Sequence, residues 1–222
     1  GRMGDIYGRV FDRVEDPNSP HTGEIIYEDG LPQLTDDVEK VGNYNHDWRG
    51  GIGSTFSYEN LQLNVLFDVR KGGLLYSNTH ATGIEGGSLE STTRARNETV
   101  VGDGVVQSDD GTYSENTEEA AYVTWLRTYY DRPNVESNSF DATYVKLREL
   151  SLRYNFTSDW LTRAGVQNVG VSVTGRNLFL WTDVPHVDPE TTISGGDGQI
   201  PGFEVQQIPS TRSFGMNVQL NF

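Results

Sequence analysis

The sequence S213-F-G-M-N-V-Q-L-N-F222 alternates apolar and polar residues without a break. The apolar positions are Phe214, Met216, Val218, Leu220 and Phe222, and small or polar residues stand between them. A period of two residues is typical of a β-strand whose two faces meet different surroundings. The stretch therefore predicts a strand over 211–222 and an all-β protein around it.

Four other segments carry the same alternation. Residues 48–58 and 61–71 predict two strands joined at Glu59-Asn60, which together form a hairpin. Residues 144–156 alternate too, but Val145 and Leu147 are out of phase with the apolar residues after them, which predicts a β-bulge near Arg148-Glu149. Residues 168–181 predict a further strand whose phase is ambiguous after Gly175, and residues 6–11 a weaker strand.

The predicted strands are long and their connections alternate in length. Each strand has about 11 to 14 residues, roughly twice the usual 5 to 6, and close to what a tilted strand needs to cross a bilayer. Short turns alternate with connections of about 70 and 30 residues, as in outer-membrane barrels, where short periplasmic turns alternate with long extracellular loops. Within the longer connection, residues 118–131 predict a short amphipathic helix with acids in its first turn.

Composition excludes several classes of protein. The chain has 17 Lys+Arg against 32 Asp+Glu, a formal net charge of −15, which disfavours a nucleic-acid partner because phosphates would be repelled. It has no cysteine, so thiolate metal sites and disulfides are excluded. No run approaches the roughly 18 apolar residues of a membrane helix. This criterion does not detect a barrel strand, because such a strand is apolar only at alternate positions.

Charge and aromatic residues are distributed as a membrane sheet requires. The net charge is −7 over 1–47, −8 over 72–143 and −5 over 182–210, so the strand segments are slightly basic. Aromatic residues at both strand ends predict two membrane girdles: Trp48, Tyr58, Tyr144, Tyr154, Trp181 and Phe222. Polar residues in the opposite phase predict contacts with a lumen, a substrate or a plug: Arg49, Gln62, Asn64, Asp68, Arg70, Arg153, Arg176 and Asn217.

Several motifs in one order resemble a known family. They are G42-N-Y-N-H-D-W48, F67-D-V-R-K-G-G73, Y144-V-K-L-R-E-L-S-L-R-Y154, G175-R-N-L-F-L-W-T182 and D188-P-E190. Together they resemble the C-terminal end of SusC/RagA-type TonB-dependent outer-membrane transporters. His46 stands where that family favours Pro, and the loop segments 72–143 and 182–210 are particular to this sequence. The resemblance therefore does not identify the transported cargo.

The resemblance implies a larger protein than this chain. Family members close a 22-stranded barrel around a plug in the outer membrane of a Gram-negative bacterium, take energy from the TonB complex, and pair with a SusD-like lipoprotein that captures glycans or peptides. We expect this chain to be about the last quarter of such a receptor, with the TonB-contacting N-terminal region absent. Phe214, Met216, Val218, Leu220 and Phe222 then resemble the signal read by the barrel-assembly machinery.

The resemblance also assigns each segment a place. We expect a curved antiparallel sheet of C-terminal barrel strands with long extracellular loops and one short loop helix. The segments are 1–47, an extracellular loop region with a weak strand; 48–71, a transmembrane hairpin; 72–143, a long acidic extracellular loop with a helix near 118–131; 144–181, two transmembrane strands joined by a periplasmic turn; 182–210, an extracellular loop; and 211–222, the barrel-closing strand.

Catalytic and metal-binding motifs are missing from the sequence. It has no nucleophile elbow, phosphate-binding loop or zinc-protease motif, so we expect neither an enzyme nor a cofactor, and no metal site. The competing hypothesis is a soluble secreted or periplasmic all-β module for adhesion or carbohydrate binding. It requires Trp48, Phe56, Leu63 and Phe67 to lie in a dry core against a second sheet.

Overall fold

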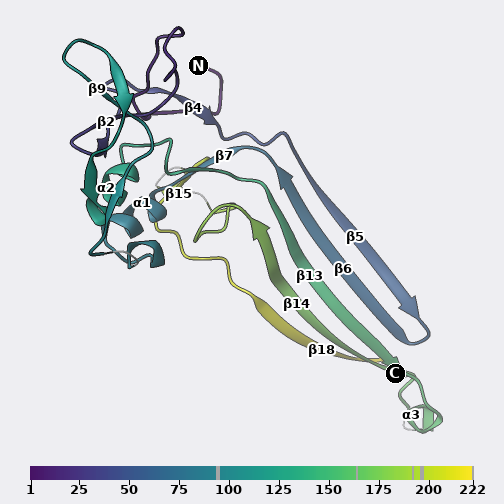
Figure 1. The fold of residues 1–222 in the computed structure, drawn as a ribbon. Coiled ribbons are helices and arrows are strands. Elements are labelled where there is room, and N and C mark those ends of the chain that lie inside the picture. Colours follow the sequence, from purple (N-terminus) through teal and green to yellow (C-terminus); the bar gives the residue numbers. More distant parts are fainter. Residues whose placement is uncertain (94–95, 164, 192, 196–197, 222) are drawn as a thin grey trace.

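The computed structural model describes residues 1–93, 96–163, 165–191, 193–195 and 198–221. A long five-stranded sheet runs along one side of the molecule, and a loop-rich body gathers at one end of it (Figure 1). The strand order is β18-β14-β13-β6-β5, and every neighbouring pair is antiparallel. The strands are β5 (Trp48–Tyr58), β6 (Leu61–Lys71), β13 (Tyr144–Phe156), β14 (Asn168–Thr182) and β18 (Ser213–Asn221).

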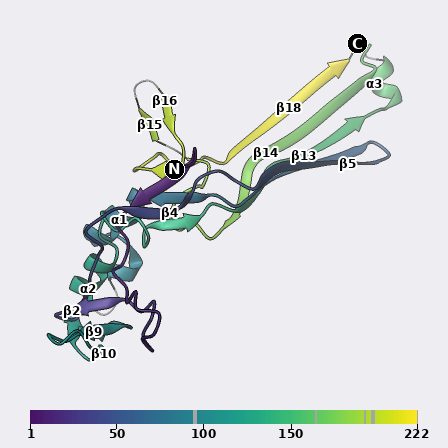
Figure 2. The same cartoon turned by 90° about the horizontal axis from the view of Figure 1, so that it is seen from above.

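The sheet is an up-and-down meander: each of its five strands lies beside the sheet strand that precedes or follows it in the sequence. It projects away from the body, with β18 along one edge and β5 along the other (Figure 2). Strands β5 and β6 pair in regular register from Trp48–Lys71 to Tyr58–Leu61 across a two-residue turn. The five strands predicted for this sheet are thus confirmed, each within two residues of its expected bounds. The weaker strand expected over 6–11 is present only as Asp5–Gly8, in a separate two-stranded sheet. Phe222 lies outside the described residues.

A β-bulge at Arg148 determines which side chains of β13 share a face. The register shifts between Leu147 and Glu149 against both neighbouring strands, as the sequence predicted. Leu147 pairs with Phe67, and Leu150, beyond the bulge, pairs with Val65. Since Phe67 and Val65 are two residues apart in a regular strand, both leucines point to one side. The bulge therefore puts the apolar residues before it, Val145 and Leu147, on the same face as those that follow from Leu150 onward.

One face of the sheet is apolar and uncovered. Ile52, Phe56, Phe214 and Met216 are 66%, 61%, 75% and 70% exposed, and within the described residues no second layer packs on them. The remaining exposed members of this face share the same phase: Trp48, Tyr58, Leu61, Val145, Leu152, Tyr154, Phe156, Val173, Phe179, Trp181, Val218 and Leu220. The structure thus contradicts the dry core that the soluble hypothesis required.

The loop-rich body contains short strands and helices. Its strands are β1 (Asp5–Gly8), β2 (Ile26–Glu28), β3 (Leu31–Pro32), β4 (Glu39–Asn43), β7 (Leu74–Ser77), β8 (Thr99–Val101), β9 (Val105–Gln107), β10 (Tyr113–Glu115), β11 (Glu119–Ala121), β12 (Ser139–Asp141), β15 (Ile193–Gly195), β16 (Gly198–Ile200) and β17 (Phe203–Glu204). The helices there are α1 (Asn78–Glu85), α2 (Tyr122–Tyr129) and the 3-10 helix η1 (Glu90–Thr92), while α3 (Asp159–Arg163) lies at the opposite, turn end of the sheet (Figure 1).

The short helix expected near 118–131 is confirmed as α2, but two details of the expectation were wrong. The structure has α1 and α3 besides the single helix expected, and α2 begins at Tyr122, after its expected start. Glu119 belongs instead to β11, which pairs with β8, so the first turn of α2 has no acid. Pairing with a strand distant in sequence overrides the local helical pattern there.

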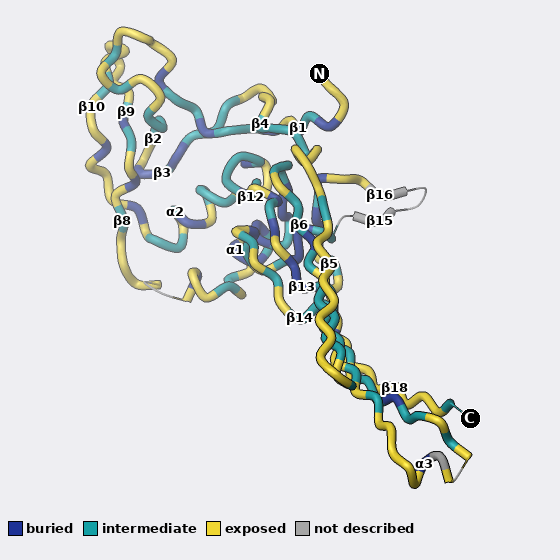
Figure 3. The backbone as a smooth tube through the Cα atoms, turned by 90° about the vertical axis from the view of Figure 1, so that its right-hand side faces the viewer, coloured by how far each residue is buried: buried dark blue, intermediate teal, exposed yellow. Residues whose placement is uncertain are grey.

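The core lies in the loop-rich body. Buried apolar side chains such as Ile6, Tyr27, Leu75 and Ile84 belong to its short elements. Figure 3 shows buried segments concentrated there and at its junction with the sheet, while the far part of the sheet is mostly exposed or intermediate. Among the described residues, no helix is both long enough and apolar enough to span a membrane.

Candidate functional site

The eight polar residues predicted to line a lumen share the second face of the sheet. The register places Arg49 opposite Arg70, and Gln62 opposite Arg153. The set comprises Arg49, Gln62, Asn64, Asp68, Arg70, Arg153, Arg176 and Asn217. We call this surface the polar face. The shared face is confirmed, whereas contact of these residues with a lumen, substrate or plug stays a prediction.

Hydrogen bonds connect the polar face across strands. Arg176 Nε donates to Glu149 Oε2 at 3.0 Å, and Thr55 Oγ1 donates to Asn64 Oδ1 at 2.8 Å. Nearer the turn end, Arg153 Nη2 donates to Gln219 Oε1 at 3.0 Å. Alternation puts these groups on one side of the sheet, and the register then brings them within hydrogen-bond distance.

A cluster of six charged side chains lies at the end of the polar face next to the loop-rich body. Asp68 Oδ2 accepts from Nη2 of Arg49 at 2.9 Å and from Nη2 of Arg148 at 2.6 Å. Both guanidinium groups also donate to Glu190 Oε1. The bulge gives Arg148 this position, because it leaves that residue without a cross-strand partner. We call these side chains, with Lys146 and Asp188, the ion cluster.

A buried lysine ties a distant loop to the sheet. Lys146 is 2% exposed, and its Nζ lies 2.6 Å from Asp188 Oδ2 and 2.6 Å from Glu190 Oε2. The D188-P-E190 motif follows β14 and folds back over the polar face to provide these carboxylates. Three cations and three carboxylates balance in the ion cluster, as buried charges require. The sequence prediction missed Lys146, Arg148, Asp188 and Glu190, although the motif itself was noted.

Glu190 is charged over a wide pH range. Burial by itself would raise the pKa of its carboxyl group, but hydrogen bonds from Arg148 and Lys146 outweigh that effect and lower the pKa to about 2. The loop that carries Glu190 is therefore held to the sheet by an ionised group at neutral pH.

The assignment of Tyr144 to a membrane girdle was wrong. Its side chain is 1% exposed and its hydroxyl donates to Glu190 Oε1 at 2.9 Å, on the polar face. Tyr144 pairs with Arg70 and Thr182, whereas the adjacent Val145 belongs to the apolar face. The sequence contained the signal, because Tyr144 shares the phase of Lys146 and is out of phase with Val145.

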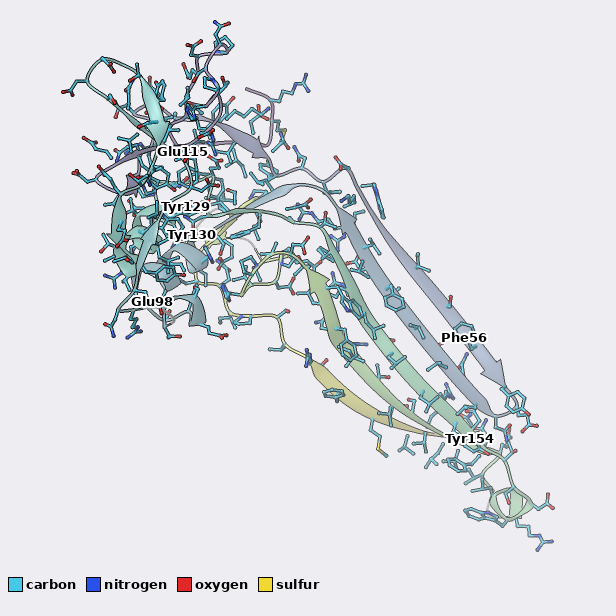
Figure 4. All side chains as sticks on the ribbon, viewed as in Figure 1. Phe56, Glu98, Glu115, Tyr129, Tyr130 and Tyr154 are labelled. Atoms are coloured by element: carbon cyan, nitrogen blue, oxygen red, sulfur yellow. The ribbon has the colours of Figure 1, made fainter. Side chains whose placement is uncertain are left out.

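The other predicted girdle residues lie on the apolar face at the expected ends. Trp48 and Trp181 are near the loop-rich body, and Tyr58 and Tyr154 are near the turn end. Figure 4 shows Phe56 and Tyr154 on the sheet strands well away from that body. Phe222 cannot be placed with them, since it falls outside the described residues. Their contact with a membrane stays a prediction.

The aromatic residues of the loops pack within the loops. Tyr129 has its ring centroid 4.6 Å from that of Phe11 and 4.8 Å from that of Trp125, and Tyr130 packs edge-on against His80 at 4.9 Å. In Figure 4, Tyr129 and Tyr130 lie inside the loop-rich body, remote from the sheet strands. Their stacking within the body stabilises it.

No group of three or more His, Asp or Glu side chains within the described residues is arranged to hold a metal ion. The carboxylates of the ion cluster instead accept hydrogen bonds from arginine and lysine. The polar face therefore presents hydrogen-bonding groups and paired charges rather than metal ligands.

No family model matches the sequence. The chain is 26% identical over 212 residues to TonB-dependent receptor P3 of Formosa agariphila, covering 90% of this chain and 19% of that protein. It is also 26% identical over 202 residues to TonB-dependent receptor P26 of the same organism, covering 85% of this chain and 18% of that protein. The chain thus spans about a fifth of the length of the curated relatives it matches.

Solved structures of one transport system share the fold. The RagAB peptide importer in its 'closed-closed' state matches with a TM-score of 0.61 at 15% identity, covering 98% of this chain and 23% of that one. The RagAB peptide transporter matches with a TM-score of 0.58 at 17% identity, with the same coverages of 98% and 23%. At these identities the structural matches show the fold alone.

Proposed function

We propose that this chain, a segment of a TonB-dependent receptor of the SusC/RagA type, forms part of the wall of an outer-membrane β-barrel that imports nutrients. The apolar face meets lipid, the polar face borders the aqueous lumen, and the loop-rich body lies on the extracellular side. The observation that carries the proposal is the uncovered apolar face on strands of 9 to 15 residues.

The strand lengths fit a bilayer. Strands rise about 3.3 Å per residue, so an 11-residue strand such as β5 extends about 36 Å. A tilted strand of about 9 to 11 residues spans the hydrocarbon core of a membrane. The core of the protein lies outside the sheet, so internal packing does not remove the apolar side chains of the sheet from water. Contact with lipid would do so.

The whole receptor has partners beyond this chain. We propose that it takes up oligosaccharides or peptides together with a SusD-like lipoprotein, energised by the TonB complex acting on another part of the receptor. The RagAB structures, described as a peptide importer and a peptide transporter, support the peptide alternative for the cargo. Deletion of the receptor should abolish uptake of labelled cargo, and affinity purification of the receptor should recover a lipoprotein.

A pair of neighbouring substitutions tests the membrane assignment. Leu220→Asp places a charge on the apolar face of β18, while Gln219→Asp places the same charge on its polar face. In the full-length receptor, Leu220→Asp should reduce the folded outer-membrane fraction, measured by heat-modifiable migration, and deletion of 220–222 should do the same. Gln219→Asp should assemble like the wild type. Equal assembly of all three variants would refute the proposal.

A further inference from the structure

A small cavity lies where the polar face meets the loop-rich body. Its volume is about 220 Å³, and three stretches of the chain that are distant in sequence enclose it. The lining includes Tyr44, Arg70, Leu74, Leu75 and Pro201. Leu74, Leu75 and Pro201 make part of the lining apolar, and Arg70 adds a guanidinium group.

Arg70 differs from the cations of the ion cluster next to it. Arg49, Lys146 and Arg148 each contact at least one carboxylate, whereas none of the ion pairs between described residues includes Arg70. Its Nη2 donates to Tyr44 O at 2.9 Å and its Nε to Gly72 O at 3.4 Å. Its Nη1 has no hydrogen-bond partner among the described residues, so part of the guanidinium is free to bind a ligand.

The backbone around Arg70 is shaped to hold the guanidinium. Gly73 has φ of +88°, and a Cβ there would lie 2.6 Å from Arg70 Nη2 and 2.6 Å from Tyr44 O. Any other residue would push the guanidinium off the Tyr44 carbonyl. The F67-D-V-R-K-G-G73 motif thus fixes the arginine at the cavity wall.

A half-buried cation that makes no ion pair is costly, and a guanidinium matches a carboxylate through two parallel hydrogen bonds. We propose that this cavity is a subsite for a carboxylate on the imported cargo, with Arg70 as the binding residue. Leu74, Leu75 and Pro201 contact the body of the ligand. The volume is below the roughly 300 Å³ of ordinary ligand pockets, so the subsite holds one unit of a chain, either an acidic sugar or the C-terminal residue of a peptide.

The inference rests on the proposed function, because the cargo reaches the cavity only in an assembled receptor. The test uses the full-length receptor purified in detergent from the outer membrane, after heat-modifiable migration has confirmed its assembly. Titration calorimetry compares glucuronate with glucose, and trialanine with trialanine amide. At least one carboxylate probe should bind about tenfold more tightly than its neutral counterpart, equivalent to about 1.4 kcal/mol. The pair that shows the preference identifies the source of the carboxylate.

Substitutions assign the preference to Arg70. Arg70→Gln should abolish it, and Arg70→Lys, which keeps a donor for the Tyr44 carbonyl, should reduce it by about threefold or more because lysine lacks the two-pronged geometry. The control Arg13→Gln removes an arginine that pairs with Glu136 in the loop-rich body and is not part of the polar face, and it should keep the preference. An assembled wild type without a preference, or a preference unchanged in both Arg70 variants, overturns the subsite but not the membrane assignment. Failure of the wild type to assemble overturns the proposed function.

Discussion

A charge in the middle of the apolar face should destabilise the receptor by an amount set by its depth. Leu152 lies near the middle of β13, is 47% exposed, and pairs with Leu63 and Val173. Its cross-strand neighbours offer no hydrogen-bonding side chain, so an arginine there would face lipid. We expect Leu152→Arg to lower the free energy of unfolding by about 2–4 kcal/mol, the cost of an arginine near the midplane of a bilayer.

Two matched variants separate membrane contact from general disruption. Ser151→Arg adds the same side chain to the polar face one residue away. Tyr154→Arg adds it to the apolar face near the turn end, where the cost should fall to about 0–1 kcal/mol. The measurement is urea unfolding of the full-length receptor in lipid vesicles, followed by tryptophan fluorescence. The reasoning is refuted if Leu152→Arg unfolds like the wild type, or if Ser151→Arg is equally destabilising.

Three further outcomes are expected. Lys146→Met leaves the buried Asp188 without its cation and removes one of the three cations that contact Glu190, so the loop around them should open at a cost of about 3–5 kcal/mol. This appears as faster amide exchange over 183–191, while Arg176→Gln leaves that exchange unchanged. The pKa of Glu190 is lowered from 4.5 to about 2, so its contribution to stability is complete above about pH 4.5 and is lost as the pH falls through about 2. Proteolysis of this loop should therefore be equally slow at pH 7 and pH 5 and become faster only in stronger acid. Glu190→Gln should remove this dependence on pH. Gly73→Ala combines φ of +88° with a 2.6 Å clash and should cost more than about 1 kcal/mol. Gly215→Ala, whose added Cβ would point into open space, should be neutral in thermal unfolding.

The strands and their two faces could be predicted from the sequence because their information is local. A period of two residues identified β5, β6, β13, β14 and β18, and the break in phase within residues 144–156 located the bulge at Arg148. The apolar and polar faces follow directly from that alternation. The mistaken position of Tyr144 came from grouping aromatic residues by strand end without following their phase.

Only the tertiary structure decided what joins the polar face to the loops. Lys146 and Glu190 are 44 residues apart in sequence, and nothing in the sequence near either one indicates the other. The cavity beside Arg70 likewise needs three separate stretches of chain to meet. Local periodicity determines the face of the strand to which a side chain points. The pairing of charges depends on how the long loops fold back onto the sheet, and the packing of the whole chain determines that.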